Sequence, residues 1–344
     1  MSIFEPCSML KGRFCLFLLF IAVSSTAAEN YTAPRTQWGQ PDLQGVWNFS
    51  SEVPMQRPEE FGERQFLTEE EIAAKRGERL QRLGSRRPIR SGNGVEAIYN
   101  DSMWAENRSN GGNVRTSLIV YPTNGRVPAR QEGIRHEPGG ERDTKGERPV
   151  RFTVGGIGRS GPEDRGLSER CLVGFNNGPQ LMPSVYNNNV QIVQHQHHVV
   201  ILSEMVHDAR IIRMGDKPLL DEQIGLWSGD SIGYWDDDTL VVVTRNFNGL
   251  TQSFEGYGSS KHKILTEKFT RIDDSTIDYE FTIDDPATFS DIIAAILPLT
   301  KVPSHLYEYA CHEGNYGMGN MLRAARAREV RSESDRVADL FHRN

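Results

Sequence analysis

The densest polar cluster on a predicted strand lies at residues 199–214, an otherwise apolar, extended segment. In one continuous strand, alternation would place Glu204, Asp208 and Arg210 on one face and His207 on the other. If the first face points into a core, its charges must be paired, because an isolated buried charge is very costly. The pattern therefore predicts either a structural ion pair of Arg210 with Asp208 or Glu204, or an acid/base or binding site in a barrel mouth. His207 joins such a site only if a bulge or the strand end redirects its side chain.

A second cluster, residues 307–316, combines aromatic rings, two acids, a thiol and an imidazole. Such a mixture can orient a small ligand, because rings supply contact area and polar groups supply direction. His312 and Glu313 form a candidate acid/base pair, although neighbours on a strand point in opposite directions. A partly buried aromatic edge strand is the structural alternative.

Roles in an acid/base enzyme can be assigned to both clusters. His207 or His312 would exchange the proton, while Asp208, Glu204 or Glu313 would orient the imidazole or share its proton. Arg210 would hold an anionic group. The two tryptophans of residues 227–235 either plug a barrel end or line a ligand entrance. The candidate aromatic contacts to a ligand are Tyr186, Trp227, Trp235, Tyr307 and Tyr309.

Metal binding is a further alternative, because His195 and His197 project to one side of an extended chain. A catalytic zinc site generally needs a third protein ligand, which His207, His312 or Glu313 would supply. Solvated histidines at a hairpin tip are the structural alternative.

The sequence lacks phosphate-binding loops, dinucleotide fingerprints, nucleophile elbows and the zinc-protease helix motif. We therefore expect no organic cofactor.

The N-terminal segment has the three-part layout of a secretory signal. Lys11 and Arg13 precede about ten apolar residues, and small residues follow up to Ala28. This run is well short of the roughly 20 residues that span a bilayer. We expect cleavage near Ala28 and a periplasmic or secreted protein without a membrane span.

The formal charge of −7 argues against nucleic acid as a partner, so a small molecule is the expected ligand. In an oxidising compartment, Cys171 and Cys311 form either one disulfide or two free thiols. The oligomeric state is not specified.

Two kinds of patterning divide the chain after the signal. Residues 29–165 read as an irregular arm with edge strands and one helix, which begins at Thr68 with the capping-box spacing to Glu71. Residues 131–151 are almost entirely polar and predict a mobile loop. From Val190 onward, short alternating segments separated by turns predict an antiparallel meander, with strands over 239–247, 264–271 and 276–283. A surface helix follows from about Gly319.

These elements predict an all-β fold: an antiparallel, lipocalin-like β-barrel over residues 166–344, closed by a C-terminal helix and forming one structural unit with the arm. Closure removes the exposed edges that a meander would otherwise leave. Barrels of this size can hold a ligand inside.

Four segments, residues 41–47, 204–212, 233–242 and 307–316, resemble a family of secreted bacterial proteins, most of them uncharacterised. The likeness spans about residues 38–328 and implies export and a single domain, but no catalytic residue. The Asp-Leu-x-Gly-x-Trp run that ends at Trp47 is also similar to the start of lipocalin-like barrels. The histidines at 195–198 are not part of this resemblance.

Three hypotheses for the function follow. The first is an enzyme performing cofactor-independent acid/base chemistry, of the lyase, isomerase or hydrolase type, on a small, partly apolar molecule. The second is a non-catalytic periplasmic ligand-binding or carrier barrel. The third is a metal-dependent hydrolase centred on His195 and His197.

Overall fold

A computed structural model describes residues 31–84, 114–135, 158–174, 178–251, 253–257 and 260–341. The predicted export signal, residues 1–28, lies outside these ranges, as does most of the predicted polar loop at 131–151.

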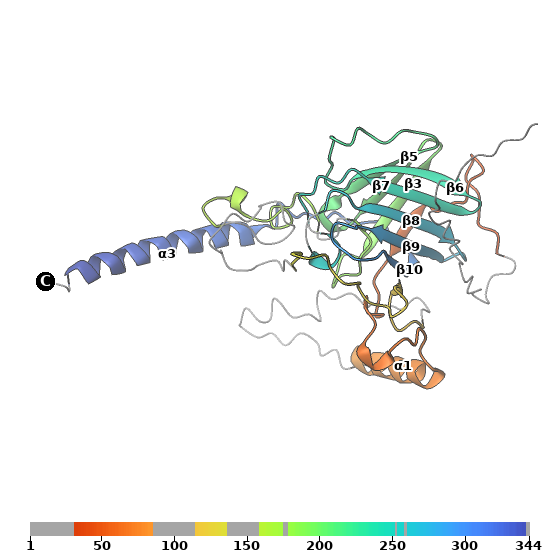
Figure 1. Ribbon diagram of the computed structural model, residues 1–344, viewed down its shortest axis with the longest axis horizontal. Coiled ribbons are helices and arrows are strands. Elements are labelled where there is room, and N and C mark those ends of the chain that lie inside the picture. Colours follow the sequence, from red (N-terminus) through yellow and green to blue (C-terminus); the bar gives the residue numbers. More distant parts are fainter. Residues whose placement is uncertain are drawn as a thin grey trace, which may run out of the picture. The chain divides into compact units, whose positions relative to one another are not determined.

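Nine strands close into a β-barrel (Figure 1). Their spatial order is β1 (Gly45–Asn48), β3 (Asn189–His195), β4 (His198–Ser203), β5 (Ala209–Met214), β6 (Asp230–Asp236), β7 (Thr239–Arg245), β8 (Ile264–Arg271), β9 (Thr276–Asp284) and β10 (Ile293–Val302), with β10 pairing back onto β1. A tenth strand, β2 (Ile119–Tyr121), pairs with β10 from outside the barrel. All neighbours are antiparallel except β5 and β6. The predicted all-β, mostly antiparallel, lipocalin-like barrel is confirmed.

Strict alternation explains the most regular part of the wall. Along β9, Ile277, Tyr279, Phe281 and Ile283 are buried, while the residues between them are less buried. The turn before β9 is fixed locally, because the Asp273 carboxylate accepts a hydrogen bond from the backbone N–H of Ser275 at 2.7 Å. The buried apolar side chains of eight barrel strands join a single hydrophobic cluster, and Trp235 of β6 packs against it. The middle of the barrel is therefore largely occupied by the protein's own side chains.

Both predicted helices are present, as α1 (Glu69–Gly84) and α3 (Tyr316–Phe341). The capping box of α1 forms as expected: the Thr68 N–H donates to Glu71 Oε2 at 2.8 Å, and the Glu71 N–H donates to Thr68 Oγ1 at 3.3 Å. Short 3₁₀ turns lie at Glu59–Phe61, Pro162–Asp164, Met205–His207 and Phe254–Gly256. None of the described helices combines the length and the apolar character needed to cross a bilayer.

Residues 199–214 do not form the one continuous strand that alternation predicted. The chain leaves β4 after Ser203, turns through Met205–His207 and resumes as β5 at Ala209. Val206 and His207 take positive φ angles of 60° and 46° within this turn, a conformation that is rare for a β-branched residue. The prediction that Glu204, Asp208 and Arg210 share one strand face is therefore wrong.

Arg210 points into the barrel and pairs with Glu267 of β8, rather than with Asp208 or Glu204. Both guanidinium Nη atoms contact the Glu267 carboxylate, with Nη2 donating to Oε1 at 3.0 Å. The Tyr279 hydroxyl donates to the same Oε1 at 2.8 Å. Burial opposes the charge of Arg210, but Glu267 outweighs it and raises the pKa of Arg210. Burial and the negative charge of Glu267 raise the pKa of Tyr279 well above 10. Because both Nη atoms of the Arg210 guanidinium are bound to Glu267, Arg210 is not placed to hold an anionic ligand.

Removing one member of the buried Arg210–Glu267 pair should lower the free energy of unfolding far more than replacing Arg210, Glu267 and Tyr279 together by apolar residues. We predict that Glu267→Gln lowers the free energy of unfolding by about 3–5 kcal/mol, because Arg210 is left buried without its counter-ion. The triple variant Arg210→Met, Glu267→Leu, Tyr279→Phe should regain most of that loss, since no charge or hydroxyl remains unsatisfied. Urea denaturation measures both, and equal destabilisation of the single and triple variants would contradict this account.

Candidate functional site

Strand directions divide the barrel into two ends. At one end lie the β4–β5 turn, the last residue of β1 and the first residues of β3, β6, β8 and β10; we call this the Asp208 end. The opposite, His195 end carries the β3–β4, β6–β7 and β8–β9 hairpins. Every neighbouring pair of barrel strands except β5–β6 is antiparallel. Residues remote in sequence therefore meet on the same rim.

Asp208 is held by two donors from separate segments. Gln180 Nε2 and Ser228 Oγ each donate to Asp208 Oδ2 at 3.2 Å. The side chain follows the strained turn directly and is half-buried. Strained backbone of this kind persists only where the surroundings over-determine it, and it is concentrated at functional sites.

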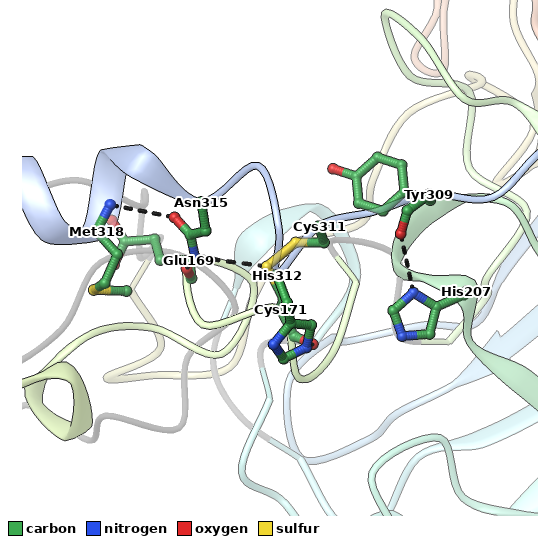
Figure 2. Close-up of a disulfide and its surroundings, with 8 residues drawn as sticks. All are labelled: Glu169, Cys171, His207, Tyr309, Cys311, His312, Asn315 and Met318. Atoms are coloured by element: carbon green, nitrogen blue, oxygen red, sulfur yellow. Dashed lines mark hydrogen bonds between the residues drawn. A yellow bond between two sulfur atoms is a disulfide. The ribbon is translucent and has the colours of Figure 1, made fainter.

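His207 projects from the same turn and is exposed, with its ring oriented by the C-terminal segment (Figure 2). Nδ1 lies 3.2 Å from the backbone carbonyl oxygen of Tyr309. A carbonyl oxygen only accepts hydrogen bonds, so Nδ1 must carry the proton in this contact. In the neutral ring, Nε2 is then the basic nitrogen.

His312 is arranged in the opposite sense. Its Nε2 lies 3.2 Å from the backbone carbonyl oxygen of Cys171, which leaves Nδ1 as the basic nitrogen of the neutral ring. The centroids of the His207 and His312 rings are 6.3 Å apart, and their planes are inclined by 39°. The structure thus brings together the two imidazoles that the sequence suggested as proton-exchanging groups.

A disulfide between Cys171 and Cys311 ties the segment that carries Tyr309 and His312 to the loop before β3 (Figure 2). Asn315 reinforces the junction: its Nδ2 donates to the Glu169 carbonyl at 2.7 Å, and its Oδ1 accepts the Met318 N–H at 3.2 Å at the start of α3. Of the two alternatives left open for the cysteines, the structure forms the disulfide.

The other predicted acids are placed less centrally. Glu204 belongs to a rim network in which Asn189 Nδ2 donates to Glu204 Oε2 at 2.8 Å, while Asn189 Oδ1 accepts from Asn48 Nδ2 at 2.9 Å. This arrangement favours a structural role for Glu204. Glu313 is exposed beside His312.

Most of the predicted aromatic contacts also lie at the Asp208 end. Tyr309 is next to Tyr186: burial, with a smaller contribution from Tyr186, raises the pKa of Tyr309. Trp227 directly precedes Ser228, the donor to Asp208, and is exposed, as is Tyr307. Trp235 does not join them, because it lies near the end of β6, at the His195 end, where it packs against the core.

His195 and His197 are also at the opposite end, in the β3–β4 hairpin. Their ring centroids are 5.9 Å apart, and the rings of Trp38 and His195 form a T-shaped contact. His207, His312 and Glu313, the suggested third ligands, belong to the Asp208 end. Within the described ranges, no group of three or more His, Cys, Asp or Glu side chains is arranged to hold a metal ion.

Sequence reasoning missed four buried polar residues at the Asp208 end. Gln180 and Ser203 lie beside Asp208, whereas Lys263 and Asp285 lie at the start of β8 and just after β9. Lys263 Nζ donates to the Gly178 carbonyl at 3.3 Å and lies 4.2 Å from the centroid of the Phe247 ring. Burial lowers the pKa of Lys263 to about 8. No local pattern marks Gln180, Lys263 and Asp285, because they lie outside the predicted strands, and Ser203 reads as an ordinary strand residue.

No protein-family model matches this chain, and no curated protein matches it in sequence.

Reduction tests whether the disulfide holds the C-terminal segment in place. We predict that Cys171→Ser with Cys311→Ser lowers the free energy of unfolding by roughly 2–5 kcal/mol, because the loop that the bridge closes is long. Reductant should lower the melting temperature of the wild type and leave that of the double variant unchanged. Peptide mapping that finds both cysteines as free thiols in the untreated protein would contradict the assignment.

Lys263 should make stability depend on pH in the alkaline range. Its pKa is about 8 in the folded protein and 10.5 in an unperturbed side chain, so between these values the unfolded chain binds more protons than the folded one. Stability must therefore rise with pH across this window. The free energy of unfolding of the wild type should gain roughly 3 kcal/mol relative to Lys263→Met between pH 8 and 10.5. Chemical denaturation measures both proteins across this range. If their free energies of unfolding change with pH in parallel, the lowered pKa of Lys263 is refuted.

Proposed function

We propose that this protein is an exported enzyme that performs acid/base chemistry without an organic cofactor, of the lyase, isomerase or hydrolase type, on a small and partly apolar molecule. The observation that carries the proposal is the pair of imidazoles at the Asp208 end. Each ring has one nitrogen fixed on a backbone carbonyl and the other left as a base. With one ring neutral and the other protonated, such a pair supplies a general base and a general acid at neighbouring positions.

The surroundings of the two rings fit this use. Both histidines are exposed, so a substrate from solvent reaches them. Tyr186, Tyr307 and Trp227 offer exposed aromatic surface at the same end for the apolar part of a small molecule. The disulfide supports an oxidising compartment and hence export.

The alternative function, a non-catalytic carrier, is supported by the same exposed aromatic side chains. In a carrier they would bind the ligand, and the imidazoles would transfer no proton. Since the buried apolar side chains of the barrel strands form one packed cluster, a carried ligand would bind at the Asp208 end rather than in the middle of the barrel.

One screen separates these functions. A panel of small esters, lactones, hydroxy acids and enolisable ketones is incubated with the protein in D₂O and followed by NMR and mass spectrometry. An enzyme hydrolyses, eliminates or deuterates at least one member, whereas a carrier binds a member and returns it unchanged.

For any substrate that is turned over, His207→Asn and His312→Asn should each lower turnover by roughly 10²- to 10⁴-fold, the usual contribution of a general acid or base. His195→Asn is the matched control, because it removes an imidazole from the opposite end of the barrel and should leave turnover unchanged. Full turnover by folded His207→Asn and His312→Asn variants would contradict the proposal.

A further inference from the structure

A small cavity lies at the Asp208 end, next to the strained turn that carries His207. Its walls are Phe49, Gly174, Gln180, Ser203, Met205 and Asp208, and its volume is about 10 Å³. This is about the smallest space that admits one water molecule, and no organic substrate fits it.

Two buried polar atoms on the lining residues lack a partner within the described structure. They are Gln180 Oε1 and Ser203 Oγ, on side chains that are only 4% and 7% exposed. The orientation of the Gln180 amide follows from chemistry, because its NH₂ group must face the Asp208 carboxylate, which only accepts. Oε1 is thereby left to find a donor elsewhere. Buried polar groups without partners are uncommon and point to an ordered water or ion.

We propose that this cavity is a binding site for a single water molecule. The water donates its two protons to Gln180 Oε1 and to the Asp208 carboxylate, and it accepts a hydrogen bond from the Ser203 hydroxyl. Two acceptors and one hydroxyl proton match the two protons and one of the two lone pairs of water. No other described group is needed to satisfy the two orphaned atoms.

The water has a positioning role as well. Ser203 ends β4, Asp208 precedes β5, and Gln180 belongs to the segment before β3. A molecule bound to all three fixes both ends of the turn from which His207 projects. Its effect on catalysis rests on the proposed function, whereas its presence does not.

Crystallography at high resolution tests the site with matched variants. The wild type should show one density peak within hydrogen-bonding distance of Gln180, Ser203 and Asp208. Ser203→Val removes the hydroxyl and fills the space with methyl groups, so the peak should vanish. Ser231→Ala, which removes another buried hydroxyl of the barrel wall, hydrogen-bonded to Thr244, should keep it. An empty cavity in the wild type, or an anomalous peak at this position after a thallium(I) soak, would overturn the assignment to water.

The positioning role has its own measurement, the imidazole resonances of His207 in ¹⁵N NMR spectra. Ser203→Val should shift them, while Ser231→Ala should not, and the resonances of His195 should stay unchanged in both. If Ser203→Val does not fold, Gln180→Leu serves as the second variant, because it removes the amide oxygen. Unchanged His207 resonances in a folded variant that lacks the water would refute the role. A missing water alongside inactive His207→Asn would remove this inference and leave the proposed function standing.

Discussion

Closure of the barrel by β1 is the constraint on which the remaining structure depends. This four-residue strand pairs with β3 on one side and β10 on the other, and it removes the two long edges that the meander would otherwise expose. Its Trp47 is fully buried, with the indole N–H donating to the Leu43 carbonyl at 2.9 Å. Once the wall is closed, the position of every strand end is fixed, and the strand ends of the Asp208 end are brought to one rim.

The site at the Asp208 end is then fixed by contacts between segments that are remote in sequence. Gln180 and Ser228 hold Asp208, the Tyr309 carbonyl orients His207, and the disulfide holds the segment that carries Tyr309. The first three contacts join the rim to segments outside the barrel wall, and the disulfide joins two such segments. The barrel thus serves as a rigid frame, and its chemistry is built on connections that the frame positions.

How much of this could be predicted depends on the range of the interactions involved. Strands β8 and β9 were predicted nearly to the residue because their two-residue alternation is local, and α1 because Thr68 and Glu71 are only three residues apart. His207, Asp208, His312 and Tyr309 were predicted from their residue types, and the structure brings them to one end. The turn after Ser203 could not be predicted, since nothing nearby signals a positive φ at Val206. The partner of Arg210 is likewise 57 residues away, and Gln180, Ser203 and Lys263 become buried only when loops fold over the rim.

Long-range ¹H–¹⁵N NMR of the imidazoles tests most directly whether His207 and His312 are held by opposite ring nitrogens, each leaving the other nitrogen as a base. At a pH where both rings are neutral, the account predicts that His207 carries its proton on Nδ1 and His312 on Nε2. A His207 ring protonated on Nε2, or a His312 ring protonated on Nδ1, would contradict it.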